Sequence, residues 1–243
     1  MFNIDKKTML IILGVMVLVN VLLGQRSIEG IIISLPGVIV AMTFHEFAHA
    51  WAATKLGDET PRQQGRLSLN PISHIDPVGL ICLMLLGFGW GKPVQINPRN
   101  FDGKYSISKA EAIVAAAGPI MNFILAFLFL IISSVDGNIL IFAFVSWQIT
   151  TTTNVISSIL ISIISVNLGL GVFNLIPIYP LDGAKVLNNF LPYKAKEWMI
   201  RNQTILTIIV FAIVFYTDII PYITTWVLKG MIWLVDLIMG LFI

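Results

Sequence analysis

Charged residues are scarce in this chain of 243 residues. They make up 12% of it, about half the share found in ordinary globular proteins. Apolar residues make up 57%, and a single core of this size cannot hide so much apolar surface from water. We therefore expect lipid to be part of the solvent. The composition excludes a disordered chain and a fibrous repeat.

Cysteine is almost absent, since Cys82 is the single one. It has no intrachain partner, which excludes a secreted disulfide scaffold. The net charge of +2 is too small to favour a nucleic-acid partner. The sequence contains no internal repeat, low-complexity tract or long polar stretch. We therefore expect one membrane-embedded domain over residues 1–243, without an appended soluble domain.

Six apolar runs are long enough to cross a bilayer, which takes about 20 helical residues. The first lacks a small-residue cleavage site, so we expect an uncleaved anchor. Two further apolar stretches are too short to span. Residues 78–91 contain four glycines, and we expect a re-entrant or interfacial segment or buried strands there. We expect residues 139–147 to lengthen the third helix or to lie in the interface. The sequence predicts an all-α polytopic membrane protein of about six transmembrane helices, with a short re-entrant or β-containing segment between the second and third. The runs are 8–24, 31–55, 110–135, 155–176, 200–216 and 222–242.

Basic residues predict the orientation, because Lys and Arg are rare in short loops on the translocated side of a membrane. Of the 15 in the chain, two precede the first run. Seven lie between the second and third runs when Lys55 at the end of the second is included, and four lie between the fourth and fifth when Arg201 at the start of the fifth is included. Arg26 falls on the opposite side, and Lys229 is inside the last run. The sequence therefore predicts a multi-pass protein of the cell membrane with both termini in the cytoplasm.

The residues that carry chemistry begin with His45-Glu46-Phe47-Ala48-His49 in the second run. Residues four apart share one helix face, so both imidazoles can reach one metal ion. Glu46 is offset by one residue and can take a proton from water at that metal. Such residues are costly inside an apolar run unless they serve a function. The alternative is a pair of interfacial histidines, with Glu46 extended toward water.

A catalytic zinc site needs a third protein ligand and one open position. His74, in the polar loop after the second run, is one possible ligand, and a few carboxylates near the membrane are others. Asp182 stands out because it ends a proline-rich turn after the fourth run, and broken backbone at membrane depth can line a cavity. From the residues alone, Asp182 is equally well a cap or turn residue. The carboxylates are Asp182, Asp218, Asp236, Glu111 and Asp136.

Taken together, "FHEFAHAW" and the later "NLIPIYPLDG" resemble the motifs of the site-2 protease family. Members of that family are intramembrane zinc metalloproteases that pair H-E-x-x-H with N-x-x-P-x-x-P-L-D-G on a later helix. The similarity covers a catalytic core of about residues 31–190 and is to compact bacterial members without a PDZ or CBS domain. The resemblance implies that His45, His49 and Asp182 bind one Zn²⁺ and that Glu46 is the general base.

Two asparagines also have assignments that rest on this resemblance. Asn174 opens the second motif, and Asn122 lies within the third run. The resemblance implies that both line the active cleft and position substrate, where an amide can donate to a developing oxyanion. The alternative for Asn122 is an interhelical hydrogen bond.

The sequence thus predicts an intramembrane zinc metalloprotease that hydrolyses a peptide bond within or near a transmembrane segment of a membrane-protein substrate. Lys55 lies ten residues past His45, about 15 Å along a helix, so the zinc should lie in the bilayer toward its cytoplasmic side. Two alternatives use the same ligands: a catalytically silent zinc-binding scaffold, and a metal or proton transporter. Glu46 argues against the scaffold, and the lack of repeat symmetry argues against the transporter.

Overall fold

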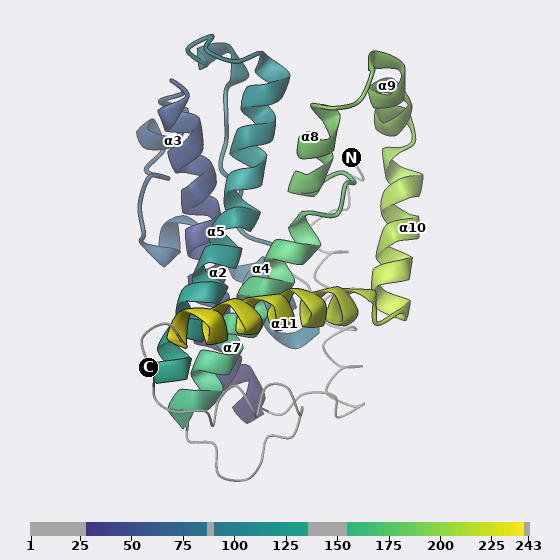
Figure 1. The fold of residues 1–243 in the computed structure, drawn as a ribbon. Helices are drawn as coiled ribbons and strands as arrows, with labels where there is room; N and C mark the ends of the chain where they lie inside the picture. Colours follow the sequence, from purple (N-terminus) through teal and green to yellow (C-terminus); the bar gives the residue numbers. More distant parts are fainter. Residues whose placement is uncertain (1–27, 87–89, 136–154, 241–243) are drawn as a thin grey trace.

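The computed structural model describes residues 28–86, 90–135 and 155–240 (Figure 1). Over these residues the chain is helical, and its one β-type pairing is an isolated antiparallel bridge between Ile75 and Gly91. The predicted all-α class is confirmed for this part of the chain. The helices are α2 (Ile28–Lys55), α3 (Thr60–Gln63), α4 (Pro77–Leu86), α5 (Ile107–Val135), α7 (Val155–Asn174), α8 (Asp182–Asn188), α9 (Tyr193–Arg201), α10 (Gln203–Tyr216) and α11 (Ile219–Met239), with 3₁₀ turns η1 (Pro71–Ser73) and η2 (Pro98–Asn100).

Four helices are long and apolar enough to cross a membrane, namely α2, α5, α7 and α11. The consecutive helices α9 and α10 meet the same test together, although they are bent by 73° at their junction. These five correspond to the second through sixth predicted runs. The predicted first run, 8–24, and the apolar stretch 139–147 lie outside the described residues.

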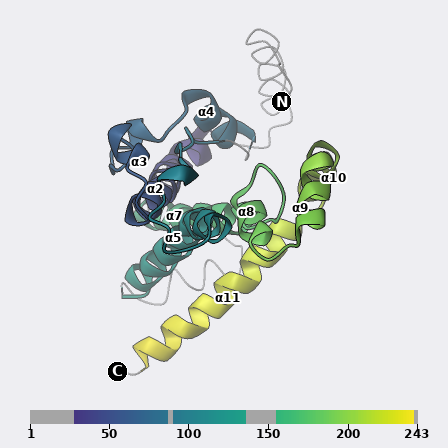
Figure 2. The same ribbon diagram turned by 90° about the horizontal axis from the view of Figure 1, so that it is seen from above.

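Helices α2, α5 and α7 pack against one another and form a three-helix unit (Figures 1 and 2). Membrane helices approach closely where small residues meet, and this unit shows it at Gly37 of α2. A Cβ atom at Gly37 would lie 2.8 Å from Ser162 Oγ of α7. Any side chain there would therefore push the two helices apart.

The C-terminal helices α9, α10 and α11 complete the described fold. The predicted fifth run, 200–216, corresponds mostly to α10, which begins at Gln203, and only its first two residues belong to α9, which ends at Arg201. Helix α11 runs across α5 and α7 in Figure 1 and packs against both. Its Leu228 and Val235 enter a cluster of buried apolar residues that also includes Ile164 of α7.

The polar segment between α2 and α5 is organised by Asp58, which is fully buried. Its carboxylate accepts hydrogen bonds from the backbone N–H of Asn97 at 2.7 Å and the side chain of Asn100 at 3.0 Å. These bonds join the two ends of the segment. Within it, the predicted re-entrant stretch 78–91 contains the apolar helix α4, which packs against α2, and its last residue, Gly91, makes the isolated bridge.

Candidate metal centre

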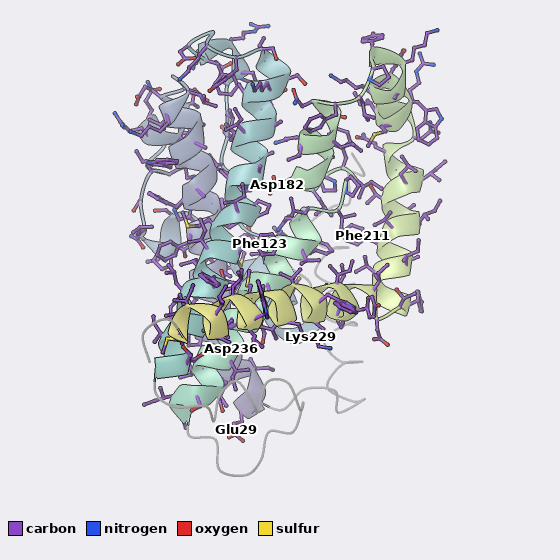
Figure 3. The ribbon with its side chains drawn as sticks, viewed as in Figure 1. Glu29, Phe123, Asp182, Phe211, Lys229 and Asp236 are labelled. Carbon is purple, nitrogen blue, oxygen red and sulfur yellow. The ribbon has the colours of Figure 1, made fainter. Side chains whose placement is uncertain are left out.

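Three potential ligands converge where α2, α5 and α8 meet. The Nε2 atoms of His45 and His49 lie 3.0 Å apart. Asp182 Oδ2 lies 3.1 Å from the first and 3.2 Å from the second. In Figure 3, Asp182 stands at the start of α8, on the side that faces α5. The residues that the sequence assigned to one metal ion are therefore brought together, and among the described residues they form the one such group.

Hydrogen bonds at the far side of each imidazole settle which ring nitrogen carries the proton. His49 Nδ1 lies 2.7 Å from the carbonyl oxygen of Val114, which can only accept, so Nδ1 donates. His45 Nδ1 lies 2.6 Å from Asn122 Oδ1, and Asn122 must point that oxygen at the ring because its amide nitrogen faces the carbonyl oxygen of Ala41 at 3.1 Å. In its neutral form each ring therefore presents the Nε2 lone pair to the centre, as metal binding requires.

Two lone pairs and a carboxylate oxygen within about 3 Å of one another repel unless a cation lies between them. In a tetrahedral zinc site with bonds of about 2.0–2.2 Å, neighbouring ligand atoms lie about 3.3 Å apart. The separations of 3.0–3.2 Å in this structure are close to that value. Two imidazole nitrogens and one carboxylate oxygen also suit zinc and leave a fourth position open. The donor set therefore fits a catalytic zinc ion.

The chain delivers Asp182 to this point by folding back after α7. Asp182 is the first residue of α8, and the next residue, Gly183, lies directly against the carbonyl oxygens of Leu175 and Ile176. A side chain at Gly183 would collide with that backbone. Glycine is therefore required for the turn that aims the carboxylate at the two histidines.

Gly118 of α5 lies in close contact with both imidazoles. A Cβ atom there would lie 2.5 Å from His49 Nε2 and 2.7 Å from His45 Cε1. These distances are shorter than carbon–nitrogen or carbon–carbon contacts allow. The absence of a side chain at Gly118 therefore makes room for the ligands.

Glu46 is half-buried and is held by a segment that is distant in sequence. Its Oε2 accepts a hydrogen bond of 3.1 Å from the backbone N–H of Val94. Oε1 faces Gly91, where a Cβ atom would lie 3.3 Å away. One carboxylate oxygen is thus fixed by the backbone, and the other has no hydrogen-bond partner among the described residues, which leaves it able to accept a proton.

The amide of Asn122 is fully committed in this structure. Besides its bonds to His45 and Ala41, its Nδ2 donates to Asn167 Oδ1 at 2.9 Å, and both asparagines are fully buried. Asn122 therefore makes the interhelical contact that was its alternative interpretation. Asn174 donates to Leu170 O within its own helix at 3.0 Å. The substrate-positioning roles of both asparagines stay predictions.

Sequence reasoning missed Asn167 and the contact of Gly118 with the two imidazoles. A buried asparagine in an apolar run was a usable signal, because polar residues in membrane helices are costly. His74, the alternative ligand, is buried in the polar segment with its Nε2 at 2.6 Å from the carbonyl oxygen of Ser68. It does not join the group of three.

Comparisons with known proteins find one family and two relatives. Residues 33–217 match the model of peptidase family M50. The chain is 38% identical over 189 residues to "Putative zinc metalloprotease YwhC" of Bacillus subtilis (strain 168), a match that covers 76% of this chain and 81% of that protein. It is 31% identical over 102 residues to "Putative zinc metalloprotease Rip2" of Mycolicibacterium smegmatis, which covers 41% of this chain and 39% of that protein. No solved structure matches.

Proposed function

Because this chain belongs to peptidase family M50, a family of zinc metalloproteases, we propose that it hydrolyses a peptide bond within or beside a transmembrane segment of another membrane protein. The chain is an integral membrane protein with several candidate spans. The proposal adds the depth of the reaction and the class of substrate. It also places the site toward the cytoplasmic side of the cell membrane, with both termini in the cytoplasm.

The exposed apolar residues of α5 support a metal centre at the depth of the bilayer. Ile120, Ile124, Leu128 and Ile132 follow one another at intervals of four, and each is about half exposed. Such a stripe of large apolar side chains suits lipid rather than water. Gly118 and Asn122, on the other side of the same turns, contact the histidines. The metal centre and the lipid-facing stripe therefore share one level of the same helix.

The chemistry follows from the groups at this centre. A zinc ion bound by His45, His49 and Asp182 would polarise the attacking water and the scissile carbonyl. Glu46 takes the proton of that water on Oε1 while the Val94 N–H holds Oε2 in place. Glu46 then gives the proton to the leaving nitrogen. The Val114 carbonyl and Asn122 keep both imidazoles in the tautomer that can bind metal.

The test of this function is cleavage of a single-span membrane protein by the purified enzyme in liposomes. Glu46→Gln should lower turnover by at least about a hundredfold, the smallest effect typical of a lost general base, and should keep about one zinc per chain. Glu197→Gln is the matched control, because Glu197 is an exposed partner of Arg201 on α9, and it should cleave normally. Undiminished cleavage by Glu46→Gln would refute the mechanism.

The substrate must unwind next to the site, because the carbonyls of an intact helix are hydrogen-bonded and shielded. Gly, Pro or Asn near the cleavage point lower the cost of leaving the helix. Replacing these residues with Leu should slow cleavage without preventing membrane insertion of the substrate. Equal rates would refute the unwinding requirement, and faster cleavage of a water-soluble peptide would refute the intramembrane depth.

The orientation has its own test, in a Cys82→Ser background. Single cysteines at Ser106, Asn138 and Asn188 are exposed to a membrane-impermeant thiol reagent added outside the cell. The basic-residue distribution predicts labelling of Asn138→Cys alone. External labelling at position 106 would overturn the proposed orientation while leaving the peptidase chemistry unaffected.

A further inference from the structure

A polar cavity of about 430 Å³ lies in the segment between α2 and α5. None of the metal ligands lines it. All of its side chains can donate hydrogen bonds, and two of them are cationic. The lining residues are Gln64, Arg66, Ser73, Lys92 and Gln95.

Arg66 is the unusual member of this group, because it is only 8% exposed. Its Nη1 donates to the carbonyl oxygens of Ser73 and Lys92, which satisfies part of the guanidinium but does not neutralise it. Within the described part of the chain, no carboxylate oxygen lies within 4.0 Å of the Arg66 or Lys92 side chain. A buried cation without an anion is costly. The charge therefore calls for a partner from outside these residues.

The remaining donors indicate the chemistry of that partner. Gln64 Nε2 donates to Gln95 Oε1 at 2.9 Å, and the Gln95 amide nitrogen has no acceptor among the residues that the structure describes. The Ser73 hydroxyl and the Lys92 ammonium add further donors. A carboxylate has two oxygens for such a set, whereas a phosphate has three or four, and Arg with Lys is a frequent pair at phosphate sites. We propose that this cavity binds a phosphate group between Arg66 and Lys92.

Two sources can supply such a phosphate. Leu69 and Ile72 are 51% and 83% exposed and lie just before Ser73 in the chain. Apolar side chains beside a cationic pocket suit the interface of an anionic bilayer, where a phospholipid headgroup is at hand. Free phosphate or a soluble phosphate ester is the other source.

The test measures binding and does not depend on cleavage. The full-length protein in neutral detergent is titrated by calorimetry with inorganic phosphate and, in a second arm, with short-chain phosphatidylglycerol. Lys92→Gln removes one cation but keeps the backbone bonds of Lys92 to His74 and Arg66. It should weaken binding about tenfold, the effect of one lost charge-assisted hydrogen bond. Arg66→Lys should weaken it as well.

Lys104→Gln is the matched control, because Lys104 is an exposed lysine of the same polar segment that does not line the cavity. It should bind as the wild type does. The ligand whose binding depends on Lys92 identifies the source as soluble phosphate or headgroup. If neither ligand binds, the proposal is wrong. It is also wrong if Lys92→Gln and Lys104→Gln weaken binding equally. If Arg66→Lys fails to fold, the comparison of the two lysine variants still decides.

Discussion

The α2–α5–α7 unit and the α9–α11 region are both rich in apolar residues, yet they differ in the side chains that they bury. In the first, polar side chains such as Asn122 and Asn167 are fully buried and bonded to one another, and small residues let the helices approach. In the second, large apolar side chains such as Ile205, Ile208 and Trp233 are more than 60% exposed.

The difference follows from lipid as the solvent. Apolar side chains need no protein partner there, whereas a polar group must find one within the protein. Among the described membrane helices, the buried polar side chains therefore gather in the unit that carries His45 and His49, and the C-terminal helices expose many of their large apolar side chains. A substitution should consequently have very different effects in the two regions, even when the chemistry of the change is the same.

The largest contrast is expected from adding one methyl group to a helical glycine in each region. Gly118→Ala places a Cβ atom 2.5 Å from His49 Nε2, so the ligands must move. Gly230→Ala in α11 meets nothing within 4 Å, and alanine is favoured over glycine in a helix by about 1 kcal/mol. We expect Gly118→Ala to lose zinc and activity, and Gly230→Ala to keep both.

Metal analysis of the purified proteins and cleavage rates in liposomes measure this contrast. Circular dichroism shows whether Gly118→Ala remains helical, which separates a displaced ligand from an unfolded protein. Full zinc content in a folded Gly118→Ala would show that the imidazoles do not rest on α5 as the structure places them.

A smaller contrast is expected from the same Asn→Leu change in each region. Asn167 supports the chain of hydrogen bonds through Asn122 to His45, and losing a partner that orients a metal ligand weakens metal binding by about 10–100-fold. The Asn202 side chain donates to Trp198 O of the preceding turn, at 2.8 Å, and makes no other hydrogen bond to the described residues. Asn167→Leu should weaken zinc affinity by that factor, and Asn202→Leu should leave it unchanged. Competition with a chelator of known affinity measures both, and equal affinities would contradict the supporting role of Asn167.

How much of this arrangement the sequence predicts depends on the range of the contact. The grouping of the three candidate ligands was predictable, because His45 and His49 share a helix face by spacing alone and the resemblance supplied Asp182. The contact of Gly118 with the imidazoles was not predictable, because it depends on the rotation of α5 relative to α2. Likewise, the helix break between Arg201 and Gln203 falls at the polar start of the fifth run and is marked by neither proline nor glycine, so the sequence pattern did not reveal it.

A pH-dependent loss of stability is expected from Asp58, in the polar segment between α2 and α5 whose Val94 N–H binds Glu46. Burial raises the pKa of the Asp58 carboxyl, but hydrogen bonds from Thr60, Asn97 and Asn100 outweigh burial and lower the pKa below its ordinary value of 3.8. The folded state thus binds the proton more weakly than the unfolded state does. The stabilisation by Asp58 is complete above the ordinary pKa and is lost as the pH falls through the lowered value.

We therefore expect the melting temperature of the wild type to fall between pH 5 and pH 2 by more than that of Asp58→Asn, which has no carboxylate to protonate. Asp58→Asn should already be less stable at pH 7, because its amide nitrogen cannot accept the bonds that the carboxylate accepts. Parallel melting curves for the two proteins over this range would contradict the assignment.

The smallest effect is expected where the two regions touch. Phe173 of α7 and Phe211 of α10, which is labelled in Figure 3, meet edge to face with ring centroids 5.8 Å apart. Such a pair contributes about 0.5–1.5 kcal/mol beyond the area that it buries. Phe211→Leu keeps an apolar side chain but removes the ring, so it should lower the melting temperature by a few degrees, since 1 kcal/mol shifts the melting temperature of a chain of this size by about 2–4 °C. Zinc content should not change, because all three ligands come from α2 and α8. A loss of zinc in Phe211→Leu would show that α10 helps to hold the metal centre, and the separation of the two regions would then be wrong.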